Sequence, residues 1–86
     1  PENDTDQFLL DISTMRTIDI EPGHAIDITI EAYINNEWIE IIATSSGEMF
    51  SYELYPEEFD ATIFKIELFS ETRDCTNPYQ LQIGFP

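Results

Sequence analysis

The sequence predicts an all-β protein, an antiparallel β-sandwich of about seven short strands. In segment after segment, apolar side chains occupy every second position, as expected of strands whose successive side chains point to opposite faces. Turn-forming residues separate these segments roughly every ten residues, a spacing typical of sandwiches and small barrels. Isoleucine, threonine and aromatic residues are abundant, and no long stretch carries apolar side chains at helical spacing.

The clearest strand is predicted at residues 25–34. One of its faces is apolar and the other largely polar, so we expect it to be half-buried with an acidic outer side. Two shorter alternating segments precede it, at residues 8–13 and 17–21. Pro22-Gly23 then turns the chain, because proline fixes φ near a turn value and glycine accepts positive φ. The apolar face of the long strand carries Ile26, Ile28, Ile30, Ala32 and Ile34.

Asn35-Asn36 follows the long strand and predicts a tight hairpin, because asparagine tolerates the left-handed backbone that such turns require. The returning strand, residues 37–44, has apolar side chains on both faces. We expect Trp38 either to cap the core or to mark a covered face. Alternation places Ile39, Ile41 and Ala43 on one face and Trp38, Glu40 and Ile42 on the other.

The remaining predicted strands are residues 50–55, 61–70 and 79–85, each with alternating apolar side chains. Pro56 ends the first of them, and a single turn near residues 56–59 is the only helix expected. Residues 1–7 form a linker-like N-terminal stretch, and residues 8–86 form a single sandwich domain, which 86 residues are long enough to build.

The composition is strongly acidic. Eighteen Asp and Glu face three basic residues, Arg16, Lys65 and Arg73, giving a formal net charge of -15. Direct nucleic-acid binding is disfavoured, because phosphate affinity comes mainly from Lys and Arg, and anionic membranes are disfavoured for the same reason. No apolar run approaches the roughly 18 residues of a membrane span, so no membrane insertion is expected. Such a field favours cations or basic proteins.

Most of the sequence resembles the immunoglobulin-like and fibronectin type III-like sandwich superfamily. Ile20-Glu21-Pro22-Gly23, followed by alternating isoleucines, resembles the turn into the second core strand. Leu54, Pro56 and Phe59, followed by the alternating run from Thr62, resemble the approach to the penultimate strand. The resemblance implies an Ig-like fold over roughly residues 8–85. The chain departs from it by lacking a tyrosine at the Phe59 position and a disulfide pair; a jelly roll, a carbohydrate-binding module and a novel β fold remain alternatives.

The sequence predicts no enzyme. A nucleophile needs a base within hydrogen-bond reach, most often histidine, and His24 is the only one. Its place after Gly23 favours an exposed turn residue. Cys75 cannot form a disulfide within the chain, and we expect an unpaired loop thiol, with a reactive thiol or an intermolecular disulfide as the alternatives.

No cofactor-binding motif is recognisable, and calcium is the small ligand that acidic loops favour, since hard cations take oxygen ligands. Solvated acidic loops are the simpler interpretation, because neither acidic cluster matches an EF-hand. The calcium candidates are Asn3, Asp4 and Asp6 in one cluster, and Glu57, Glu58 and Asp60 in another. The candidates for a sugar-binding or protein-binding surface are the aromatic residues Tyr33, Trp38, Tyr52, Tyr55 and Tyr79, which could equally pack in the core.

Two functions fit these observations. The first is a noncatalytic Ig-like module of a larger secreted or cell-surface protein, serving as a structural spacer or as an accessory domain that binds protein or carbohydrate. The second is a free-standing acidic inhibitor, such as a nuclease immunity protein, a DNA mimic or a phage antagonist, which would cover a basic surface in the cytoplasm.

Overall fold

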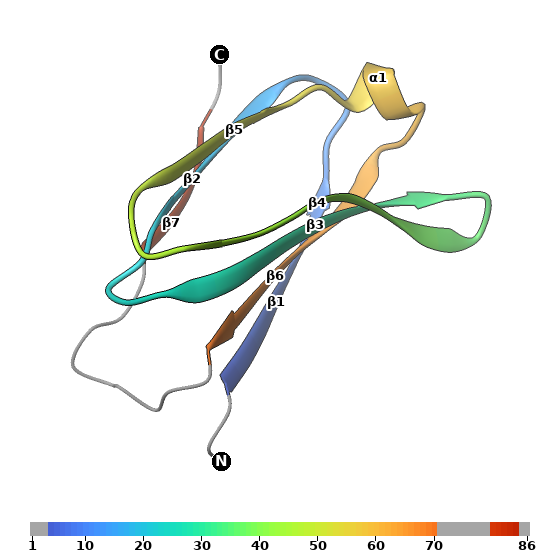
Figure 1. The fold of residues 1–86 in the computed structure, drawn as a ribbon. Helices are drawn as coiled ribbons and strands as arrows, with labels where there is room; N and C mark the ends of the chain where they lie inside the picture. Colours follow the sequence, from blue (N-terminus) through green and yellow to red (C-terminus); the bar gives the residue numbers. More distant parts are fainter. Residues whose placement is uncertain (1–3, 71–79, 85–86) are drawn as a thin grey trace.

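The structure is a computed structural model that describes residues 4–70 and 80–84. This part of the chain forms seven strands and one short helix, arranged as two antiparallel sheets that face one another (Figure 1). The predicted all-β class is therefore confirmed. The elements are β1 (Asp4–Asp11), β2 (Arg16–Glu21), β3 (Ile26–Ile34), β4 (Glu37–Ser46), β5 (Phe50–Leu54), α1 (Pro56–Phe59), β6 (Ile63–Ser70) and β7 (Gln80–Gly84).

The strand order is β1-β6-β3-β4 in one sheet and β5-β2-β7 in the other. Three strand pairs are nested in sequence, as in one long hairpin: β3–β4 is innermost, β2–β5 encloses it, and β1–β6 encloses both. Successive pairs lie in alternate sheets. The two terminal strands lie in different sheets, with β1 beside β6 and β7 beside β2. The sandwich is thus closed by long-range pairs rather than by neighbours in sequence.

β1 begins earlier than the sequence suggested. Residues 4–7, expected to belong to a linker-like stretch, are part of the strand and pair with the end of β6. Gln7 Nε2 donates a hydrogen bond of 2.7 Å to Glu67 Oε2 across this pair. The backbone partners offered by β6 explain the extension, because a polar segment without hydrophobic periodicity can still complete a ladder.

The turn between β3 and β4 has the predicted form. Asn35 and Asn36 both have positive φ, 52° and 66°, as type I′ turns require, and Ile34 is opposite Glu37. The pairing of β3 with β4 across this turn, which the sequence predicts, is confirmed.

β4 contains a bulge that strict alternation did not predict. Ile30 is opposite Ile42 and Glu31 is opposite Glu40, so Ile41 is the extra residue. The bulge brings Ile42 onto the same inner face as Ile39 and moves Ala43 to the outer face. The expected grouping of Ile39 with Ala43 and of Trp38 with Ile42 is therefore wrong, because one inserted residue reverses every later side chain.

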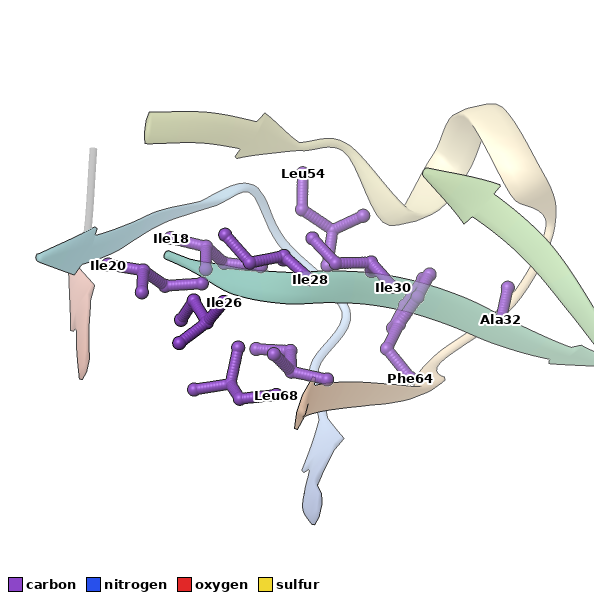
Figure 2. Packing of buried hydrophobic residues seen from close by; sticks show 10 residues of the cluster. Ile18, Ile20, Ile26, Ile28, Ile30, Ala32, Leu54, Phe64 and Leu68 are labelled. Atoms are coloured by element: carbon purple, nitrogen blue, oxygen red, sulfur yellow. The ribbon is translucent and has the colours of Figure 1, made fainter. Parts of the chain in front are cut away.

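The core lies between the sheets and is mostly isoleucine. Side chains from β2 and β5 meet those from β3 and β6, as Figure 2 shows. No polar or charged side chain is buried in the part of the chain that the structure describes. The alternation predicted for these strands is confirmed by the buried residues, which are Ile18, Ile20, Ile26, Ile28, Ile30, Ala32, Leu54, Phe64, Ile66 and Leu68.

The helix α1 covers one end of the sandwich (Figure 1) and is the single turn expected there. Pro56 begins it, which suits the fixed φ of proline, and Asp60 ends it in the left-handed region. Phe59 packs edge-on against Phe64, with ring centroids 6.2 Å apart. Among the described residues, no helix is long and apolar enough to cross a membrane.

Candidate binding surface

Two of the predicted aromatic residues form a pair on the outer face of the four-stranded sheet. Tyr33 on β3 is directly opposite Trp38 on β4, next to the hairpin turn. Their ring centroids are 5.0 Å apart and the planes are inclined by 56°, a favourable tilted arrangement. Tyr33 is 39% exposed and Trp38 36% exposed, so both rings remain accessible to a ligand.

Lys65 on β6 holds this pair in place. Its Nζ lies 4.5 Å from the centroid of the Trp38 ring and 3.2 Å from Glu31 Oε1. Glu31 is opposite Lys65 in the β3–β6 register and lies two residues before Tyr33 on the same face of β3. Lys65 is therefore next to the Tyr33–Trp38 pair on the outer face of the sheet. The ammonium group is therefore shared between a carboxylate and the face of a ring, which restrains the orientation of Trp38.

Exposed aliphatic side chains extend the surface. Leu9, opposite Lys65 on β1, is 69% exposed, and Ile63 on β6 is 39% exposed. Exposed apolar side chains gathered around an aromatic pair are typical of interaction surfaces, whereas single ones need no explanation. We name the surface formed by Tyr33, Trp38, Ile63 and Leu9, with Lys65 at its centre, the aromatic patch.

An open hollow of about 360 Å³ adjoins the aromatic patch at the α1 end of the sandwich. Tyr33 and Ile63 belong to both the hollow and the patch. Two acidic residues, Glu57 and Asp60, also line the hollow, and carboxylates accept hydrogen bonds. Its other lining residues are Ser13, Pro56, Ala61 and Thr62.

Two more of the predicted aromatic residues, Tyr52 and Tyr55, lie elsewhere in the described part of the chain. Tyr52 is opposite Ile18, and its ring is half-buried against the core, so it belongs to the packing rather than to an exposed surface. Burial, and then the negative charge of Glu58, raise the pKa of Tyr52. Tyr55 follows β5, and its hydroxyl donates a hydrogen bond of 3.3 Å to Glu53 Oε2. The negative charge of Glu53 is the main cause that raises the pKa of Tyr55.

The calcium candidates do not come together in the described residues, where no group of three or more His, Cys, Asp or Glu could hold a metal ion. Asp6, on β1, is opposite Leu68 on β6. The other three candidates, Glu57, Glu58 and Asp60, lie in or directly after α1. Asn3, the side chain of Asp4, Arg73, Cys75 and Tyr79 lie outside the described part of the chain.

His24 is half-buried, not exposed as expected. Its Nε2 lies 2.7 Å from Ser70 Oγ, a contact between the turn before β3 and the end of β6 that the sequence could not suggest. A serine and a histidine within hydrogen-bond reach can exchange a proton, but catalysis also needs a place for substrate. The hollow beside the aromatic patch includes neither residue.

No protein-family model, no curated protein sequence and no solved structure matches this chain. Among the described residues, the aromatic patch is the strongest candidate for a functional surface. Sequence analysis identified Tyr33 and Trp38 but missed Lys65, Leu9 and Ile63. Lys65 and Ile63 alternate along β6 with the buried residues Phe64 and Ile66 and therefore lie on the outer face, but only the sheet register brings them next to the rings.

Proposed function

We propose that this chain is a noncatalytic sandwich module of a larger secreted or cell-surface protein, and that it binds carbohydrate through the aromatic patch. The observation that carries the proposal is the accessible pair of Tyr33 and Trp38. Aromatic faces pack against the C–H faces of sugar rings, while nearby carboxylates accept hydrogen bonds from sugar hydroxyls. Two acidic residues, Glu57 and Asp60, line the adjoining hollow.

The strand order supports a jelly-roll arrangement more than the Ig-like one that the resemblance implied. In constant-type immunoglobulin domains the first strand joins the sheet of the second, and the last strand joins the sheet of the sixth. Here the first strand lies beside the sixth and the last strand lies beside the second. The nested pairs also correspond to a hairpin wrapped into two sheets, as in a jelly roll, a fold that occurs in lectin domains.

The test is a titration of the isotope-labelled protein with a panel of neutral oligosaccharides, followed by calorimetry with any that bind. We expect chemical-shift changes at Tyr33 and Trp38, and Trp38→Ala and Tyr33→Ala should each weaken binding at least tenfold. Tyr55→Ala is the matched control, because it removes an aromatic ring outside the patch. The proposal fails if no oligosaccharide binds, or if the control weakens binding as much as the patch variants do.

The second candidate is an acidic inhibitor that covers a basic surface. It is favoured because two of the three basic side chains already interact with other groups of this chain. Lys65 is engaged with Glu31 and Trp38, and Arg16 donates hydrogen bonds to the carbonyls of Thr14 and Met15. With eighteen acidic residues against three basic ones, little compensates the negative field. We expect a basic protein to be retained by the immobilised chain at low salt and released by salt; retention of none would remove this candidate.

A further inference from the structure

Among the residues that the structure describes, β7 carries none of the features that protect the other edge strands. Edge strands commonly avoid pairing with other chains through charged side chains, bulges or inward-pointing charges. β1 carries Asp6 on its inner face, β4 carries the bulge at Ile41, and β5 carries Glu53. β7, with the sequence QLQIG, has no charge, no proline and no bulge, and within the described residues it pairs with β2 alone.

The pairing pattern itself has an open position beside β7. In each nested pair, a strand of the N-terminal half of the long hairpin lies beside a strand of the C-terminal half, and the outermost pair is β1–β6. The next strand after β6 is β7, and no strand in the described part of the chain stands opposite it in this pattern. One further strand beside β7 would continue the three-stranded sheet and bring the two sheets to equal width.

The side chains around this edge specify what would fit. On the inner face, Leu81 and Ile83 are half-buried and are opposite Ile20 and Ile18, so apolar side chains of an added strand would extend the core over them. This favours an incoming strand with an apolar residue at every second position.

The outer face of the same edge is acidic. Asp19 is opposite Gln82 and Glu21 is opposite Gln80, and these four residues line a shallow hollow of about 40 Å³. An added strand would lie two strand spacings, roughly 10 Å, from β2. A Lys or Arg side chain lying across Gln82 or Gln80 covers this distance.

We propose that the edge of β7 facing away from β2, which has no strand partner among the described residues, binds an extended basic segment of a partner protein as an added strand. Apolar side chains of the segment pack beside Leu81 and Ile83, while its Lys or Arg side chains reach Asp19 and Glu21. A second copy of this chain is disfavoured, because each copy carries a formal net charge of -15. The inference rests on the second candidate function for the sign of the partner's charge and adds the place and the backbone geometry of the contact.

The experiment uses an end-capped heptapeptide of alternating lysine and valine, titrated into the labelled protein. In a strand, alternate residues direct their N–H and C=O groups to opposite edges, so an added strand uses only one of its own edges. Two further peptides carry N-methyl groups on the lysines or on the valines. We expect one methylated peptide to bind as the parent does and the other to bind at least tenfold more weakly, with shift changes along β7.

Protein variants locate the charged contact. Asp19→Asn combined with Glu21→Gln should weaken the parent peptide several-fold, whereas Glu40→Gln combined with Glu37→Gln removes the same charge from the other sheet and should have little effect. The strand-addition inference is overturned if the parent peptide does not bind, if both methylated peptides bind equally, or if sedimentation shows that a second copy occupies the edge. Equal binding of both methylated peptides that salt abolishes would retain the acidic-inhibitor candidate while removing the edge site.

Discussion

Replacing Lys65 with methionine tests the interactions that orient the aromatic patch. Methionine keeps an unbranched side chain of similar length but removes the charge, so packing along the stem is retained. The change removes the ion pair with Glu31 and the cation–π contact with Trp38 together. Lys65→Arg is the matched control, because the guanidinium can make both interactions.

The magnitude follows from the geometry. At 3.2 Å the Coulomb attraction between Lys65 and Glu31 is about 5 kcal/mol for an effective dielectric constant near 20. Desolvation and side-chain ordering offset most of it, leaving about 1 kcal/mol for a pair whose side chains are 17% and 23% exposed. The cation–π contact adds about 0.5–1 kcal/mol. We therefore expect Lys65→Met to lower the free energy of unfolding by about 1–2 kcal/mol.

Urea denaturation followed by far-UV circular dichroism measures this change, and this signal also serves variants that lack Trp38, the one tryptophan of the chain. With an m-value near 1 kcal/mol/M, the midpoint should fall by about 1–2 M. Two double-mutant cycles separate the contributions, Lys65→Met with Glu31→Gln and Lys65→Met with Trp38→Phe. The Glu31 coupling should shrink at high salt, because screening acts on ion pairs near the surface. Coupling energies below about 0.3 kcal/mol in both cycles would refute the view that Lys65 holds the patch together.

Three further predictions concern the turn, the bulge and the half-buried Tyr52. Asn36→Val should lower the free energy of unfolding by about 1–2 kcal/mol, because a β-branched residue resists φ of 66°, while Asn36→Gly should not destabilise the hairpin; urea denaturation tests both. Deleting Ile41 should leave a folded protein that self-associates more readily at high salt, where screening weakens the repulsion between acidic copies, because a regular β4 edge pairs more easily; light scattering against protein concentration measures this. The raised pKa of Tyr52 means that the folded state binds its proton more tightly than the unfolded state, so this contribution to stability is complete below about pH 10 and declines above it; Tyr52→Phe should flatten the decline in urea midpoint between pH 9 and pH 11.

The fold class was accessible from sequence because burial in a two-layer sandwich imposes a period of two. The alternation of Ile28 and Ile30 with Asp27 and Thr29 directly reflects one buried face and one exposed face. The turn at Asn35-Asn36 was equally local, since the residue type determines which backbone angles are accessible.

What local pattern could not provide was register and strand order. The adjacent pair Ile41-Ile42 breaks the alternation, but only the partners on β3 show that Ile41 is the inserted residue. The contact of Lys65 with Trp38 joins β6 to β4 across β3, and no spacing in the sequence encodes it. The same holds for Ser70 beside His24, which are 46 positions apart.

The aromatic candidates show how much of the site local pattern can predict. An aromatic residue in an alternating strand is assigned to a face only when the phase of that strand is known. Tyr33 falls in the polar phase of β3 and is exposed, whereas Tyr52 falls in the apolar phase of β5 with Leu54 and packs inward. The phase of each strand is a property of the sequence, and it is sufficient to separate these two candidates.

Charge and edge geometry together determine which kinds of strand can pair with β7. A bulge such as that at Ile41 blocks every incoming strand, because it distorts the backbone ladder whatever the partner's sequence. The net charge of the chain, in contrast, distinguishes between partners, since it repels another copy and attracts a basic segment. Within the described residues the strand β7 is regular and carries no charged side chain, and Asp19 and Glu21 lie on the neighbouring strand, so the protection found at this edge is electrostatic. An edge protected in this way excludes its own kind while remaining open to a partner of opposite charge, and raising the salt concentration should weaken both effects together.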